Sequence, residues 1–171
     1  LLGAFQVAAS DVKVQVEWNV DRVKVFRQVG YLRHQLKKED FRNNKIDAAE
    51  ISAAESGNAL YVVQVKADGE GPLGMVRVRY KMPFTSEYTE MEWSLAHEST
   101  ATPLEQTSPA MRLASVAATF AEWLAKNPYS QGVQLADLQG LLSGIPSIYA
   151  TDPRPAQLEI MIRKSHILAG N

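Results

Sequence analysis

The chain contains no cysteine, and this absence removes several kinds of chemistry. Without thiols there is no disulfide, no thiol nucleophile and no cysteine-ligated zinc or iron–sulfur cluster. Long apolar runs are also missing, since no stretch approaches the roughly 18 residues of a membrane-spanning helix. We therefore expect no transmembrane segment and no cofactor that depends on thiolate ligands.

An excess of either charge is missing as well. The 171 residues include 18 Lys and Arg and 19 Asp and Glu, for a formal net charge of −1. Binding to nucleic acid usually requires a basic patch or a basic half of the chain. We therefore expect no nucleic-acid partner. Hydrophobic residues make up 46% and charged residues 22%, a balance that is typical of folded globular domains.

The first residues lack the features of a secretion signal. The chain starts Leu1-Leu2-Gly3-Ala4-Phe5, with no initiating Met and no basic region before the apolar residues. We interpret this start as that of a fragment from a longer protein.

The first half of the chain has the period-two alternation of strands. Residues 12–18 alternate between apolar and polar side chains, and a second strand is predicted over residues 23–31, after a turn at 19–22. A hairpin of these two strands would place Trp18 opposite Val23 and Val16 opposite Val25. The polar residues 32–58 are predicted to form a long connection with at most a short helical turn.

Three further strands are predicted over residues 60–66, 75–81 and 88–95. Pairing of the first two would place Val65 opposite Val76. Pairing of the last two would place Val76 opposite Trp93 and Arg77 opposite Glu92. A slip by one residue would mix apolar and charged faces, so this register is well specified. We interpret the row Arg77, Arg79 and Lys81 as a solvated face of the sheet. Its positive charges are balanced by Glu90 and Glu92 on the neighbouring strand.

Helical periodicity replaces the alternation after a Ser/Thr/Pro-rich link at residues 97–107. Ser108 is a good N-cap with Pro109 at the first helical position, and residues 135–142 predict a second helix that ends at Gly144 and Pro146. A third helix is predicted from Asp152 through residue 168. The expected fold class is α+β, with about five mainly antiparallel strands followed by about three C-terminal helices. We expect a single domain over residues 11–171, strand-rich at 11–97 and helical at 108–169.

Several sequence motifs of catalytic and cofactor-binding sites are only partly matched, or lack the expected context, in this chain. Residues 69–74 match G-x-G-x-x-G, but they connect two predicted strands, whereas a dinucleotide site needs a helix after the loop. We interpret them as a hairpin loop. His97-Glu98 starts like H-E-x-x-H but the second His is missing. The nucleophile elbow G-x-S-x-G and the phosphate-binding P-loop do not occur.

The connection at residues 32–58 holds the densest group of oxygen-bearing side chains. Calcium requires six to eight oxygen ligands, and the acidic loop 39–55 offers several. The weak candidates for a metal site are Asp40, Asn44, Asp47 and Glu50. The loop lacks the glycine of an EF-hand and is interrupted by basic residues, so a solvated loop is the ordinary interpretation.

The three tryptophans are interpreted as core residues. Trp18 and Trp93 lie on predicted strands, and Trp123 lies on the first predicted helix. Trp123 is displaced from the apolar stripe of Leu113, Phe120 and Leu124, so it is the one that could flank an interface.

Several segments resemble a known family in order and spacing. They are residues 12–19, 26–31, 39–41, 45–51 and 59–61, with 114–120 and 128–129 in the helical part. Through them the chain resembles the uncharacterised C-terminal region of bacterial proteins that carry a von Willebrand factor type A domain. It departs from that family at Ser52-Ala53-Ala54-Glu55, where the family tends to a glycine-rich turn that contains His.

The resemblance implies an A-type domain upstream in the same polypeptide. Residues 1–10 would then be the tail of the last helix of that domain. The metal motif of the A domain, Asp-x-Ser-x-Ser, does not occur in this chain. The resemblance also implies a location in the bacterial cell envelope or periplasm.

Three functions are compatible with these observations. The first is a non-catalytic accessory or protein-interaction module beside the A domain, with no catalytic residue and no cofactor of its own. The second is a module that binds a small ligand or a cation through the acidic loop 39–55. The third is an enzyme whose carboxylates are brought together by folding, with Asp40 and Glu50 as first candidates.

Overall fold

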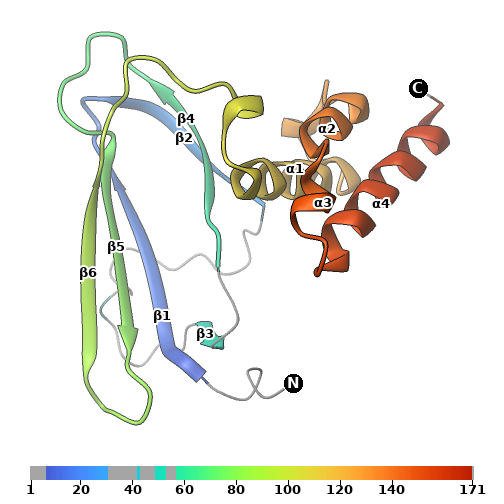
Figure 1. Ribbon diagram of the computed structural model, residues 1–171. Coiled ribbons are helices and arrows are strands. Elements are labelled where there is room, and N and C mark those ends of the chain that lie inside the picture. Colours follow the sequence, from blue (N-terminus) through green and yellow to red (C-terminus); the bar gives the residue numbers. More distant parts are fainter. Residues whose placement is uncertain (1–6, 31–41, 43–48, 53–56, 171) are drawn as a thin grey trace. The chain divides into compact units, whose positions relative to one another are not determined.

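The computed structural model describes residues 7–30, 42, 49–52 and 57–170. The chain divides into two compact units, Leu1–Ser99 and Thr100–Asn171, which are described separately below. Their boundary falls within the link predicted at residues 97–107. The first unit contains the strands and the second unit the helices (Figure 1).

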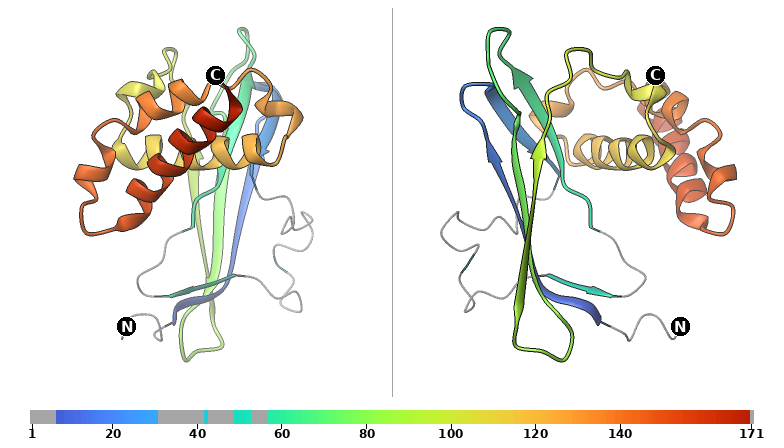
Figure 2. Two further views of the ribbon diagram at one scale, coloured as in Figure 1. Left: turned by 90° about the vertical axis from the view of Figure 1, so that its right-hand side faces the viewer. Right: turned by 60° about the vertical axis from the view of Figure 1, so that its left-hand side comes forward.

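The first unit contains all six strands of the described residues. They are β1 Val7–Trp18, β2 Val23–Val29, β3 Ala49–Ser52, β4 Leu60–Val65, β5 Gly74–Lys81 and β6 Tyr88–Leu95. A four-stranded sheet has the order β3-β1-β5-β6, and a two-stranded sheet consists of β2 and β4. Every pairing is antiparallel, and Figure 2 shows β1, β5 and β6 side by side.

The predicted register between the last two strands is confirmed. Val76 lies opposite Trp93, and Arg77 lies opposite Glu92. The same pairing continues over all eight residues of β6 without a register shift. Because the loop between β5 and β6 is short and both strands have one apolar face, local sequence was sufficient to specify this pair.

The other two predicted pairings are wrong. β1 pairs with β5 instead of β2, so that Val16 lies opposite Val76. β2 pairs with β4, so that Phe26 lies opposite Val63. The turn after β1 does form where predicted, but its residues bond to the loop between β4 and β5. Asn19 donates its side-chain amide to the carbonyls of Glu70 and Pro72, at 3.0 and 2.9 Å.

Two segments differ from the sequence-based expectation in their local structure. Residues 7–10, which the family resemblance assigned to a helical tail, belong to strand β1. β3 lies within the segment predicted to be an irregular connection, and it pairs with the start of β1 through two register shifts. A four-residue strand with shifted pairing leaves too short a periodic pattern to recognise in sequence.

The second unit is helical, with α1 Pro109–Leu124, α2 Leu135–Leu142, α3 Ile145–Ile148 and α4 Pro153–Ala169. Two 3₁₀ helices, η3 Leu104–Gln106 and η4 Pro128–Ser130, complete its described elements. The predicted caps are confirmed, since Ser108 accepts a hydrogen bond from the Met111 N–H and Asp152 from the Arg154 N–H. The sequence does not predict the short α3, because proline usually ends a helix, whereas Pro146 occupies the first turn of α3.

The apolar core of the second unit is continuous across its four helices. Its buried members are Val116, Phe120, Leu135, Leu138, Leu142, Ile145, Leu158 and Ile162. In the described part of the first unit, Val23 is the one hydrophobic residue that is buried. The fold class is α+β as predicted, and among the described residues the helical unit buries far more apolar side chains than the strand unit. Within the described residues no helix is long and apolar enough to cross a bilayer.

Candidate functional site

One face of strands β1, β5 and β6 is apolar and partly exposed: Val14, Met91 and Trp93 are exposed, whereas Val16, Val76 and Val78 are half-buried. We call the residues that form it the apolar face: Val14 and Val16 from β1, Val76 and Val78 from β5, and Met91 and Trp93 from β6. They are direct cross-strand neighbours, so their side chains form one surface. Val14 is 53% exposed and Trp93 48% exposed. The prediction of Trp93 as a core residue is therefore wrong.

An exposed apolar surface of this kind has a physical consequence. Contiguous apolar patches are uncommon on folded monomers and mark contact surfaces for proteins, membranes or ligands. The predicted register already placed Val76, Val78, Met91 and Trp93 on one face. The exposure of this face does not follow from the sequence, because no local pattern tells which elements cover a sheet face.

The opposite face of the sheet is charged and internally paired. Arg77 on β5 contacts Glu17 on β1 at 2.5 Å and Glu92 on β6 at 3.3 Å. Arg42 makes two hydrogen bonds to the carboxylate of Glu90, at 2.7 and 3.2 Å. These bonds lower the pKa of Glu90, and the bond to Glu17 raises that of Arg77.

Part of this charged face is buried, which corrects the expectation of a solvated row. Lys13 is 1% and Arg79 9% exposed, and the two residues lie opposite each other on β1 and β5. Asp11 contacts Lys13 at 3.3 Å and accepts a hydrogen bond of 2.7 Å from the hydroxyl of Tyr88. The Arg79 guanidinium lies 3.8 Å from the centre of the Tyr88 ring. Burial of like charges requires such partners.

The glycine motif at residues 69–74 has a structural role. A Cβ on Gly69 would lie 2.5 Å from the backbone oxygen of Asp21, and a Cβ on Gly74 would clash with that of Glu17. Glycine therefore permits the close approach of residue 69 to the turn after β1 and of residue 74 to strand β1 itself. The loop leads from strand β4 to strand β5, as the sequence predicted, and no helix follows it directly. It is not a hairpin loop, because β4 and β5 belong to different sheets.

The junction of the two sheets also involves Trp18. Its ring centre lies 5.3 Å from those of Phe26 on β2 and Tyr61 on β4. Burial raises the pKa of Tyr61. Trp18 thus holds the two-stranded sheet beside the end of β1, which agrees with a packing role.

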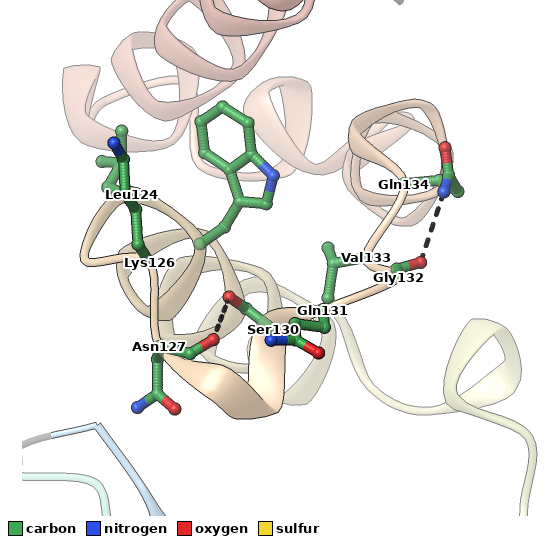
Figure 3. Close-up of a pocket in the computed structure, with 9 residues that line it drawn as sticks. Leu124, Lys126, Asn127, Ser130, Gln131, Gly132, Val133 and Gln134 are labelled. Atoms are coloured by element: carbon green, nitrogen blue, oxygen red, sulfur yellow. Dashed lines mark hydrogen bonds between the residues drawn. The ribbon is translucent and has the colours of Figure 1, made fainter.

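An open groove of about 650 Å³ lies in the helical unit, between the end of α1 and the start of α2 (Figure 3). Trp123, Leu124 and Val133 contribute apolar surface to it. Trp123 stacks on Phe120 with ring centres 6.0 Å apart, so it is part core and part groove wall. Lys126 is the single ionisable residue among those that line the groove. The groove therefore lacks a pair of groups for acid–base catalysis.

Polar groups around the groove are used to shape the loop. The Ser130 hydroxyl donates to the carbonyl of Asn127 at 2.7 Å, and the Gln134 side chain to that of Gly132 at 3.4 Å (Figure 3). The Asn127 side chain accepts a hydrogen bond from the Tyr129 N–H at 3.0 Å. These bonds fix the chain between α1 and α2 and explain why a groove persists there.

The candidate metal residues lie almost wholly outside the part of the chain that the structure describes, so the predicted cation site stays a prediction. Asp40, Asn44 and Asp47 lie outside the described residues, and of Glu50 the structure gives only its place in strand β3. Among the residues that are described, no group of three His, Asp or Glu side chains is placed to hold a metal ion. His166 lies 3.4 Å from the Gln139 side chain, at hydrogen-bond distance.

An antiparallel sheet unit with a partly exposed apolar face, followed by a helical unit, defines an α+β module in structural terms. Comparison with known proteins gives the family. The protein-family model described as "Uncharacterized protein YfbK, C-terminal" matches residues 3–71 and 64–160 of the sequence. The chain belongs to this family.

One curated relative is the uncharacterized protein YfbK of Escherichia coli strain K12. It is 28% identical over 140 residues, a match that covers 71% of this chain and 24% of the relative. The chain thus spans about a quarter of the length of that relative. No solved structure matches the chain significantly.

Proposed function

We propose that this chain is a non-catalytic accessory and protein-interaction module, which adjoins a von Willebrand factor A-type domain in the same polypeptide. The observation that carries the proposal is the apolar face on β1, β5 and β6. Burying such a surface against a partner is favourable, at about 25 cal/mol for each Å² removed from water.

Family membership supports the part of the proposal that concerns a longer polypeptide. The curated relative extends far beyond the matched region, which covers 24% of its length. A neighbouring domain on the same chain would meet the apolar face at high effective concentration, so modest contacts would suffice. The role we assign is to position or regulate the binding surface of that neighbour.

A substitution on the apolar face tests the proposal. The double variant Val14→Thr/Met91→Thr makes the face more polar and leaves a β-branched residue, which suits a strand, at both positions. Thermal unfolding would be recorded for this chain and for the longer protein that contains the A-type domain. We expect the variant to lower the transition temperature of the longer protein more than that of this chain, because only the longer protein buries the face.

The matched control is Val62→Thr on β4, since Val62 is 57% exposed and belongs to the two-stranded sheet. It should affect both proteins equally. Equal effects of the double variant on both proteins would contradict docking of the apolar face on the neighbouring domain. Separate, independent transitions in the longer protein would contradict the accessory role itself.

We place the protein in the bacterial cell envelope or periplasm, on the strength of the family resemblance. Fractionation of cells that produce the natural, full-length protein, with detection by an antibody against this chain, tests the assignment. Recovery in the cytoplasmic fraction alone would contradict it.

A further inference from the structure

Strand β6 forms an edge of the four-stranded sheet in the part of the chain that the structure describes. It pairs with β5 on one side, and the strand order ends there. Natural edge strands are commonly protected by Lys, Pro, a bulge or a very short length. β6 has eight residues without Lys or Pro, and its pairing with β5 shows no register shift. It therefore presents a regular row of main-chain donors and acceptors.

The side chains of β6 add specificity to this edge. Met91 and Trp93 extend the apolar face to the edge of the sheet. Glu90 and Glu92 lie on the other side of the strand, with side chains 30% and 62% exposed. Arg42 already holds Glu90 through two bonds, whereas Glu92 makes one longer contact with Arg77, at 3.3 Å. Glu92 is thus the acidic group best able to accept a further cation.

The sequence of β5, which already pairs with β6, shows which side chains suit a strand beside β6. Val76, Arg77 and Val78 of β5 lie opposite Trp93, Glu92 and Met91. An incoming strand on the other side of β6 would meet the same side chains in the same alternation. Apolar residues would extend the apolar face, and a basic residue would face Glu92.

We propose that the edge of β6 that faces away from β5, unpaired among the described strands, binds an extended segment of a partner protein by strand addition, with a basic residue between two apolar ones. This inference rests on the proposed role as a protein-interaction module, and it specifies how a partner protein would contact the sheet. A second copy of β6 fits less well. Antiparallel self-pairing centred on Met91 would place Glu90 opposite Glu92, and pairing centred on Glu92 would oppose two copies of Glu92. Like charges directly opposite one another are destabilising.

The probe is a fluorescein-labelled peptide, Thr-Val-Arg-Val-Arg-Val-Thr, titrated with the full chain and followed by fluorescence anisotropy. We expect saturable binding, weakened by about tenfold or more in Glu92→Arg because a like charge replaces an opposite one. A peptide with Glu in place of both Arg residues should bind Glu92→Arg better than it binds the unsubstituted chain. This reversal shows that the variant is folded and that the charge at position 92 selects the strand.

The control for charge is Glu70→Arg, in the exposed loop between β4 and β5, which should leave binding unchanged. The control for strand addition uses two peptides that are N-methylated at alternate residues. Because alternate N–H groups of a strand point to opposite sides, one set should abolish binding and the other should not.

Failure of the unsubstituted chain to bind, or equal binding by Glu92→Arg, would overturn the inference. Equal tolerance of both N-methylated peptides would also overturn it, since it would indicate contact through side chains alone. If these results occur while the apolar-face variants still act selectively on the longer protein, strand addition fails and the proposed function stands.

Discussion

The hydroxyl of Tyr88 on β6 donates a hydrogen bond of 2.7 Å to Oδ2 of Asp11 on β1, across the intervening strand β5. Asp11 has a positive φ of 50°, at the point where the pairing of β1 with β5 shifts register. The same carboxylate contacts the buried Lys13. The bond from Tyr88 therefore holds the Asp11 carboxylate beside the buried Lys13 ammonium, whose charge the carboxylate compensates.

Tyr88→Phe should lower the stability of the strand unit, because it removes a donor from a carboxylate that is largely enclosed. The bond to Asp11 raises the pKa of Tyr88, so its contribution is fully present below the ordinary tyrosine pKa of about 10 and is lost as pH rises through the raised value. The measurement is urea unfolding of both proteins at neutral and at alkaline pH. A difference that persists unchanged at high pH would contradict this assignment.

Arg42→Gln should raise the pKa of the Glu90 carboxyl towards its ordinary value, because the hydrogen bonds and charge of Arg42 lower it. With the pKa lowered, the contribution to stability is present above the unfolded-state pKa and is lost as pH falls through the folded-state value. An NMR titration of the Glu90 side chain checks the shift. An unchanged titration would show that the Arg42–Glu90 pair does not persist in solution.

Gly69→Ala should destabilise the junction of the two sheets, because the added Cβ would meet the backbone of Asp21 and Arg22. The same substitution at Gly140, within α2 and with open space around its Cβ position, should stabilise by about 0.5–1 kcal/mol. Denaturant unfolding of both variants provides the comparison. Effects of the same sign at the two positions would contradict the close approach at Gly69.

Leu142→Ala should cost about 2–5 kcal/mol, because Leu142 is fully buried in the core of the helical unit. Leu124→Ala, in the same unit but at an exposed position, should change stability by less than about 0.5 kcal/mol. Hydrogen exchange of the Leu142→Ala variant should show faster exchange of backbone amides in the helices and not in strands β5 and β6. Equal loss in both units would mean that the units unfold as one.

The helical unit was largely predictable because its signals are local. Ser108 and Asp152 cap α1 and α4 as expected, and α2 has the predicted bounds. The register of β5 with β6 was predictable for a related reason, since a short loop and two alternating patterns leave one acceptable alignment. The missed α3 depends on a Gly144 of positive φ and on Pro146, both of which also end helices.

The sequence by itself determined helices α1, α2 and α4, most strands and the alternation that makes one side of β1, β5 and β6 apolar. Tertiary structure alone decided that β1 pairs with β5 and β2 with β4, because pairings between distant segments depend on which faces meet after collapse. It also decided that Lys13 and Arg79 are buried while Val14 and Trp93 are exposed. Periodicity gives the two faces of a sheet, and only the placement of the surrounding chain determines which face is covered.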